Sequence, residues 1–252
     1  MRLVRFQDEG RAAYGILEGD EVAELEGDIF GPLNTRPARR PLSRVRLLAP
    51  CSPGKIVAVG LNYRDHAEEL GLAVPDEPII FLKPPTTVIG PGEAVAYPPM
   101  SAQVDYEAEL GIVIRDQVKN IGPEQARDHI LGYTCANDVT ARDLQRKDGQ
   151  WTRAKSFDTF CPAGPWIETE LDPDDLLVES YLNGKRRQSS RTAQFIFPVD
   201  RLVSFISQIM TLSPGDLIIT GTPAGIGPMK PGDEIEVRIE GIGSLTNTVI
   251  AK

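Results

Sequence analysis

The sequence predicts an α+β fold that is rich in β-strand and carries only a few helices on its flanks. Short apolar runs recur along all 252 residues, and 23 Gly and 21 Pro separate them as in strands joined by tight turns. The few helical patterns do not alternate regularly with the strands, so a parallel βαβ array is not predicted. No internal repeat is present.

Residues 1–50 predict a small β domain that ends in a linker. Apolar runs at 3–6, 13–17 and 22–25 are separated by acidic and glycine turns. Segment 31–50 is rich in proline and carries five arginines, but it contains no aromatic residue and the net charge of the chain is −9. We therefore expect a solvated linker without a role in nucleic-acid binding, followed by a second domain over residues 51–252.

The second domain is expected to mix strands with short helices. After a buried strand at 56–59, Asn62 is a candidate cap for a helix over 63–70 that Gly71 ends. Proline position and apolar periodicity predict further helices at 123–130, 141–148 and 199–210. Apolar runs predict the remaining strands at 79–82, 105–114, 131–139, 178–182, 216–220, 234–239 and 244–250. An Asn183-Gly184 turn predicts a hairpin after the fourth of these.

Composition excludes several classes of protein. No segment offers the run of about 18 apolar residues that a membrane span needs, and the first residues lack the apolar stretch of a signal peptide. The three cysteines are widely spaced, so neither a disulfide framework nor a zinc knuckle is predicted. We expect a protein of the reducing cytoplasm that does not contact membranes. No GxSxG motif is present, which disfavours a serine hydrolase.

Three acidic residues are candidate metal ligands. Glu107 and Glu109 alternate on one predicted strand and therefore share a face, with Cα atoms about 7 Å apart. Asp138 ends a small and apolar strand, where an unpaired carboxylate would be costly. The alternatives are an ordinary half-solvated strand for the glutamates and a helix cap for Asp138. If the three meet, their hard oxygen donors suit Mg²⁺ or Mn²⁺ better than zinc.

Two further groups are candidates for acid–base chemistry. His66 and Glu69 are three residues apart on one predicted helix face, where a carboxylate can orient the imidazole as a general base. The alternative is a surface pair. Lys155 lies among small and aromatic residues and could stabilise an oxyanion, or it could be an ordinary surface lysine. We expect no chemistry from His129. The glycine-rich loop 221–227 lacks phosphate-loop spacing, but its backbone could approach a small ligand.

These motifs, in this order, resemble the fumarylacetoacetate hydrolase family. The resemblance rests on six segments that lie between residues 55 and 225: KIVAVGLNY (55–63), FLKP (81–84), EAELG (107–111), NDVTARD (137–143), AKSFD (154–158) and TGTPAG (220–225). It implies the family's mixed β-roll or β-sandwich, with a small N-terminal β domain, and a homodimer.

The resemblance also implies roles for individual residues. Glu107, Glu109 and Asp138 would bind Mg²⁺ or Mn²⁺, and His66 with Glu69 would activate water on a segment that orders over the ligand. Lys155 would stabilise an oxyanion. Gln145 would contact substrate, and the loop of Thr222 would meet the substrate carboxylate.

The implied activity is that of a metal-dependent enzyme of 2,4-dioxo acids or their enol forms. We expect hydrolysis of a carbon–carbon bond in an acylpyruvate through an enolate that the metal stabilises, because the cation favours charge on the C2 oxygen. Isomerisation of 2-hydroxyhepta-2,4-diene-1,7-dioate and decarboxylation of oxaloacetate are alternatives for the same site. A small-acid binding protein without catalysis is the remaining alternative.

Overall fold

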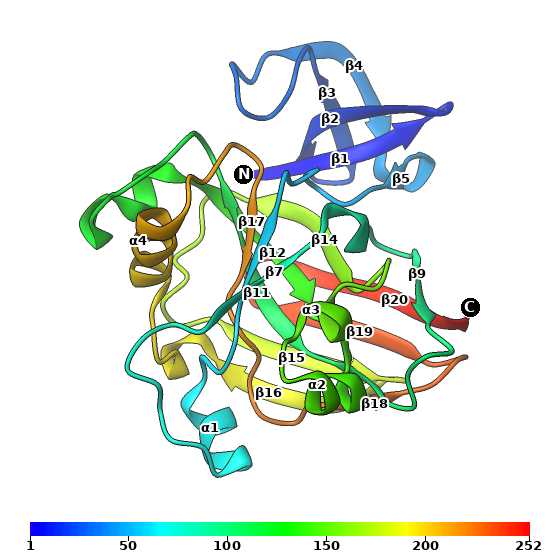
Figure 1. Cartoon of the computed structure of the whole chain (residues 1–252). Helices are drawn as coiled ribbons and strands as arrows, with labels where there is room; N and C mark the ends of the chain where they lie inside the picture. Colours follow the sequence, from blue (N-terminus) through cyan, green and yellow to red (C-terminus); the bar gives the residue numbers. More distant parts are fainter.

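One twelve-stranded sheet joins the N-terminal strands to the rest of the molecule (Figure 1). The structure is a computed structural model that describes residues 1–252. The strands of its main path follow the order β4 (Thr35–Pro41), β3 (Glu21–Leu25), β2 (Arg11–Glu18), β1 (Arg2–Asp8), β14 (Cys161–Glu168), β12 (Ile130–Asn137), β11 (Ala108–Ile114), β17 (Leu217–Ile219), β6 (Ile56–Val59) and β7 (Ile80–Lys83). The short strands β5 (Arg46–Leu47) and β8 (Val88–Ile89) pair with β1 and β14.

Two smaller sheets complete the β-structure. The five-stranded sheet has the order β16 (Lys185–Arg191), β15 (Leu177–Leu182), β19 (Glu234–Ile239), β20 (Gly243–Ala251) and β9 (Ala94–Tyr97). The three-stranded sheet has the order β13 (Thr140–Ala141), β10 (Val104–Tyr106) and β18 (Gly227–Met229). This β-rich architecture with few helices confirms the predicted fold class.

The helices are short and lie outside the sheets (Figure 1). The α-helices are α1 (Arg64–Leu70), α2 (Arg142–Asp148), α3 (Thr152–Lys155) and α4 (Val199–Ile209). The 3-10 helices are η1 (Leu42–Arg44), η2 (Pro85–Thr87), η3 (Pro123–His129) and η4 (Thr192–Gln194). The helix predicted after Pro123 is therefore a 3-10 helix. No helix is long and apolar enough to cross a membrane.

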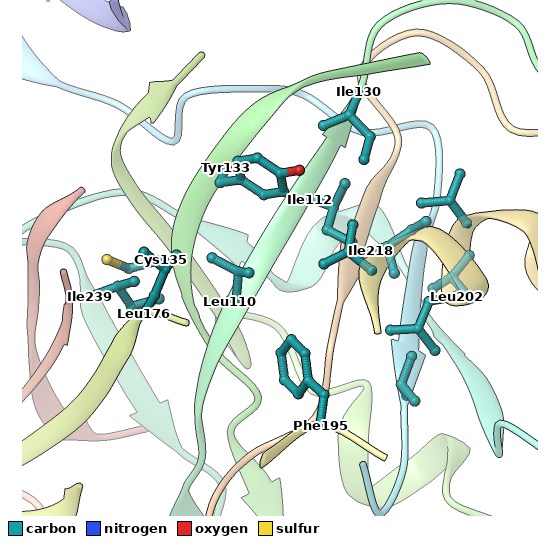
Figure 2. Packing of buried hydrophobic residues seen from close by; sticks show 14 of the residues in the cluster. Leu110, Ile112, Ile130, Tyr133, Cys135, Leu176, Phe195, Leu202, Ile218 and Ile239 are labelled. Carbon is teal, nitrogen blue, oxygen red and sulfur yellow. The ribbon is translucent and has the colours of Figure 1, made fainter. Parts of the chain in front are cut away.

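The largest hydrophobic core lies between the two larger sheets and α4 (Figure 2). Leu110 and Ile112 of β11 are fully buried beside Cys135 of β12, and Ile239 of the five-stranded sheet and Leu202 of α4 belong to the same cluster. Every residue of β11 is buried. The alternative of an ordinary half-solvated strand for this segment is therefore wrong, and any charge on β11 needs a partner.

The predicted linker over residues 31–50 is partly sheet, which corrects the sequence interpretation. β4 pairs with β3 and β5 pairs with β1. Buried Glu24 forms ion pairs with Arg36 and Arg40 from this segment and with Arg11. Two of the five arginines in this segment, Arg36 and Arg40, thus help to neutralise a buried carboxylate. The prolines of β4 obscure its strand pattern in the sequence.

Two local predictions also change. The predicted strand 105–114 is interrupted at Glu107, so that β10 and β11 belong to different sheets. Asn62 does not cap α1, whose N-cap is Tyr63 without a side-chain hydrogen bond. The end of α1 is as predicted, since Gly71 adopts the left-handed conformation with φ 64°.

Candidate active site

The three predicted acidic ligands come together. Glu107 occupies the break before β11, Glu109 lies on β11, and Asp138 follows β12 directly. Antiparallel pairing of β11 with β12 places Ala108 opposite Asn137, and the Asp138 N–H donates to the Glu107 carbonyl at 2.9 Å. One carboxylate oxygen from each side chain lies within 4.8 Å of the others. All three residues are buried, with exposed fractions of 5 %, 1 % and 1 %.

Cationic side chains surround two of these carboxylates. The Lys155 ammonium donates to Glu107 at 2.8 Å and to Asp138 at 2.6 Å. Lys83 pairs with the other oxygen of Asp138, and Arg142 pairs with the other oxygen of Glu107. Lys155 is 3 % exposed, so the alternative of a surface lysine is wrong. Asp138 is no helix cap either, because α2 begins after Ala141.

Glu109 differs from its neighbours because no cationic side chain pairs with it. Its carboxyl accepts a hydrogen bond from the Gly221 N–H at 2.7 Å. Burial and the nearby charges of Asp138 and Glu107 raise the pKa of Glu109 well above its ordinary range.

The neighbouring Glu107 has the opposite electrostatics. Burial alone would raise its pKa, but the attraction of Lys155 and Arg142 is larger and lowers the pKa to about 2. Burial would likewise lower the pKa of Lys155, but Asp138 and Glu107 outweigh it and raise that pKa. Lys155 and Glu107 are therefore both charged at neutral pH.

The donor set fits a divalent cation. Three carboxylates offer only hard oxygen ligands, which is the chemistry that Mg²⁺ and Mn²⁺ prefer. The positive charge missing beside Glu109 is what such an ion would supply. No Cys or His belongs to the cluster, so zinc is a poorer match.

His66 and Glu69 form the predicted pair. The His66 Nδ1 lies 2.9 Å from Glu69 Oε2. A carboxylate oxygen can only accept, so Nδ1 carries the hydrogen, and in the neutral imidazole Nε2 then has the lone pair. Glu69 also accepts the Gly225 N–H at 3.0 Å, which ties α1 to the glycine-rich loop. His66 is 7 % exposed, so the alternative of an exposed surface pair is wrong.

The carboxylate cluster and His66 face one cavity of about 310 Å³. Six predicted site residues line it, namely His66, Glu107, Glu109, Gln145, Lys155 and Thr222. Glu69 and Asp138 are not part of the lining but contact residues that are. Apolar side chains of Leu70, Leu72, Phe81 and Trp151 form another part of the wall. A small anion with an apolar body matches this combination.

Gln145 and Thr222 are held by neighbouring side chains. Gln145 accepts a hydrogen bond from Arg142. The Thr222 hydroxyl donates to the Ala108 carbonyl at 2.9 Å and accepts from Gln188 at 2.8 Å. The Thr222 N–H donates to no protein acceptor. The backbone of this loop, more than the hydroxyl, is thus available to a ligand.

Sequence reasoning missed Lys83, Arg142 and Gln188. Lys83 is the last residue of the apolar strand β7 and is 1 % exposed. A lysine at the end of an apolar run is the feature of the sequence that could have indicated a buried cation. Arg142 lies three residues before Gln145 on α2, where one helix face can hold both. Gln188 lies on the largely exposed strand β16 and has no signal in the sequence.

Comparison with protein families covers nearly the whole chain. A family model described as fumarylacetoacetate (FAA) hydrolase C-terminal matches residues 55–250. A second, described as Rv2993c-like, N-terminal, matches residues 1–50. Protein Rv2993c of Mycobacterium tuberculosis is 47% identical over 262 residues, covering 100% of this chain and 99% of that protein. The mitochondrial oxaloacetate tautomerase Fahd2a of Rattus norvegicus is 38% identical over 260 residues, covering 98% and 79%.

Solved structures of related proteins have the same fold. 2-Hydroxyhepta-2,4-diene-1,7-dioate isomerase from Mycobacterium marinum superimposes with a TM-score of 0.94 at 46% identity, covering 100% of this chain and 99% of that chain. Maleylpyruvate hydrolase from Sphingobium sp. SYK-6, in complex with manganese(II) and pyruvate, superimposes with a TM-score of 0.84 at 31% identity, covering 100% and 99%. Relatives of this chain thus include a hydrolase, an isomerase and a tautomerase.

Proposed function

Because this chain belongs to the fumarylacetoacetate hydrolase family, we propose that it is a divalent-metal-dependent enzyme that hydrolyses an acylpyruvate to pyruvate and a carboxylic acid. The observation that carries the proposal is the oriented imidazole of His66 in the same cavity as a buried carboxylate cluster. General bases of this kind act on a substrate or water that the cavity holds nearby.

Glu107, Glu109 and Asp138 would hold the cation, which is Mg²⁺ or Mn²⁺. When bound, it supplies positive charge for the carboxylate and adjacent carbonyl of a 2-oxo acid and for the enolate that develops there. The manganese(II) and pyruvate in the maleylpyruvate hydrolase structure support this choice of ion and substrate end.

His66 would begin the reaction by taking a proton from water at Nε2. The water oxygen then bonds to C4 of the acylpyruvate, and the C3–C4 bond breaks with its electron pair left on C3 as the pyruvate enolate. A proton returned to C3 gives pyruvate, and the other fragment is a carboxylic acid. Glu69 keeps the imidazole oriented and stabilises it while it is positively charged.

Lys155 would stabilise the oxyanion. Its ammonium has three hydrogens, of which Glu107 and Asp138 take two. The ammonium also lies 5.1 Å from the centre of the Phe81 ring, on the wall of the cavity. The third hydrogen is available to a substrate oxygen there.

Isomerisation of a 2-hydroxydienoate is the second candidate. It is favoured by the 46% identity to the Mycobacterium marinum isomerase, compared with 31% to the maleylpyruvate hydrolase. In that reaction His66 would take the proton of the 2-hydroxyl group as the C2 carbonyl forms and return a proton to C5, and no bond to water would form. The products distinguish the two candidates, since only hydrolysis gives two fragments.

The test compares His66→Ala on two substrates at one Mg²⁺ concentration. Hydrolysis of an acylpyruvate should fall by roughly 10²–10⁴, the usual contribution of a general base. Decarboxylation of oxaloacetate needs no attacking water and should keep much of its rate. His129→Ala is the control, because His129 is bound to Asp116 outside the cavity. Equal losses on both substrates in His66→Ala would refute the role of His66 as a water-activating base.

A further inference from the structure

A second cavity, of about 320 Å³, lies where the N-terminal strands meet the rest of the molecule, and the proposed function gives it no role. Arg5 of β1 lines it, together with residues 48, 49 and 51–53 of the segment between β5 and β6. Pro85, Val88 and Glu93 complete the wall. None of these residues lines the candidate active site. A cavity of this volume can hold a small-molecule ligand.

Arg5 brings a positive charge without a partner to this cavity. Val4 and Phe6 belong to the small core of the N-terminal strands, so side-chain alternation along β1 directs Arg5 to the opposite face. The side chain of Arg5 forms no ion pair or hydrogen bond with a protein group, although the residue is half-buried. A partly desolvated guanidinium without a counter-charge costs free energy, and an anion in the cavity would offset that cost.

The other titratable groups of the lining do not supply the missing negative charge. Glu93 is the one carboxylate there, and it pairs with Arg46 and accepts the Gly90 N–H at 2.6 Å. The Cys51 thiol is neutral, because burial raises its pKa to about 12. A counter-charge for Arg5 must therefore come from a ligand.

Backbone N–H groups in the wall of the cavity also lack acceptors. Ala49 and Cys51 are 7 % and 1 % exposed, and their N–H groups donate to no protein acceptor. The N–H of Ser52 has no protein acceptor either. Pro50 and Pro53 flank Cys51 and Ser52 and restrict the backbone on both sides. Because nearly all buried N–H groups in proteins are paired, this wall offers donors to a bound acceptor.

We propose that this cavity is a binding site for a phosphate group, with the Arg5 guanidinium and the N–H groups of Cys51 and Ser52 as its donors. The guanidinium fork alone can take both oxygens of a carboxylate. A phosphate group keeps further oxygens and a second negative charge for the backbone N–H groups. Leu48 and Val88 add apolar surface that suits the organic part of a phosphate ester.

A phosphate group bound there would join the N-terminal strands to the rest of the molecule. Arg5 lies on β1, whereas Cys51 and Ser52 directly precede the strands of the following domain. The direct pairing of β1 with β14 involves Arg2 and Leu3 at the start of β1. Because the donors come together only in the folded chain, phosphate should raise the unfolding temperature as its concentration increases. The site uses none of the proposed metal ligands and does not depend on the proposed function.

Calorimetry of the full chain in EDTA, at constant ionic strength, tests the site with inorganic phosphate and with glycerol 3-phosphate. We expect saturable binding of one phosphate group per chain, and Arg5→Gln should weaken it about tenfold, the order of one charge-assisted pair. Arg44→Gln, which removes an exposed arginine of η1 outside the cavity, should keep the wild-type affinity. Tighter binding of glycerol 3-phosphate would assign the site to a phosphate ester, and tighter binding of inorganic phosphate would assign it to the free ion.

Amide NMR of the wild-type protein makes the test independent of how the variants fold. The Cys51 and Ser52 N–H signals should shift during the phosphate titration with the midpoint that calorimetry gives. Arg146→Gln distinguishes the two cavities, because Arg146 lines the active-site cavity alone, and it should leave phosphate binding unchanged. Absence of saturable binding, wild-type affinity in Arg5→Gln, unmoved Cys51 and Ser52 signals, or loss of binding in Arg146→Gln would each overturn the inference.

Discussion

Glu107 and Glu109 are two residues apart, yet their pKa values shift in opposite directions because their partners differ. Lys155 and Arg142 neutralise Glu107, whereas Glu109 has a single backbone hydrogen bond and two acidic neighbours. Without a cation, an ionised Glu109 therefore costs folding free energy at neutral pH, and an ionised Glu107 contributes to stability.

Replacing each residue by glutamine should reveal this difference in metal-free protein. Below the ordinary glutamate pKa of 4.5, Glu109 is protonated in the folded and unfolded chains. As the pH rises above 4.5, the unfolded chain loses its proton while folded Glu109 retains it up to its own raised pKa, so wild-type stability falls through that interval. Glu109→Gln escapes this loss and should become more stable than the wild-type protein as the pH increases.

Glu107→Gln is the matched control with the opposite sign. The pKa of Glu107 is lowered to about 2, so its contribution to stability is present above pH 4.5 and is lost as the pH falls toward 2. This variant should be less stable than the wild-type protein at neutral pH. Urea unfolding in EDTA at a series of pH values measures the free energy of unfolding of both variants and of the wild-type protein. A Glu109→Gln variant that loses stability at neutral pH would contradict the electrostatic account.

At the scale of elements, the site is assembled by connections between strands and helices, and Asn62 joins three of them. Its side chain accepts the Phe197 N–H at 2.8 Å and donates to the Phe197 and Thr220 carbonyls at 3.2 Å and 2.8 Å. Asn62 follows β6, Phe197 precedes α4, and Thr220 follows β17 and precedes the loop of Thr222. Asn62 is fully buried, so these backbone groups have no access to water as a replacement.

Asn62→Ala should therefore lower the free energy of unfolding by about 2–4 kcal/mol, because it leaves several buried backbone groups without partners. Gln150→Ala, at an exposed amide without a protein partner, should change it by less than about 0.5 kcal/mol. Chemical denaturation measures both variants. A loss below about 1 kcal/mol for Asn62→Ala would show that these hydrogen bonds do not hold the connections together.

The spacing of apolar residues predicts a helix well when burial of one helix face is enough to stabilise it. The apolar positions of α4 predict a helix over 199–210, and the structure has Val199–Ile209. The break at Glu107 could not be predicted, because side-chain alternation continues through it while strand pairing changes from β13 and β18 to β12 and β17. Asn62 illustrates the same limit, since an asparagine before a helix is typical of a cap and its long-range partners leave no local pattern.

For the site, residue chemistry predicts the acids and the histidine pair, but not the cations that surround them. Two acidic side chains on a buried strand require positive charge nearby. The sequence pattern does not predict which lysine or arginine supplies that charge. Lys83 is 55 residues from its partner Asp138, and Arg142 is 35 residues from Glu107. Such pairs depend on the packing of distant strands and helices.

At the scale of the whole molecule, the exposed apolar surface favours association between two chains. β7 lies at one end of the main sheet, and Leu82 on it is 50 % exposed. Ile79, directly before β7, is 44 % exposed. Uncovered sheet edges with apolar side chains are uncommon in stable monomers. We therefore retain the homodimer as a proposal. Light scattering at micromolar concentration should give twice the mass of one chain, and the mass of a single chain would contradict it.

The central claim is that Glu107, Glu109 and Asp138 bind the divalent cation on which catalysis depends, and a titration of EDTA-treated protein with Mn²⁺ tests it most directly. Calorimetry of the wild-type protein should show one site per chain, and acylpyruvate turnover should return in proportion to its occupancy. Glu109→Gln should keep a folded far-ultraviolet spectrum and lose both the binding and the turnover. Full turnover of the wild-type protein in EDTA, or Mn²⁺ binding by Glu109→Gln that equals the wild-type value, would contradict the account.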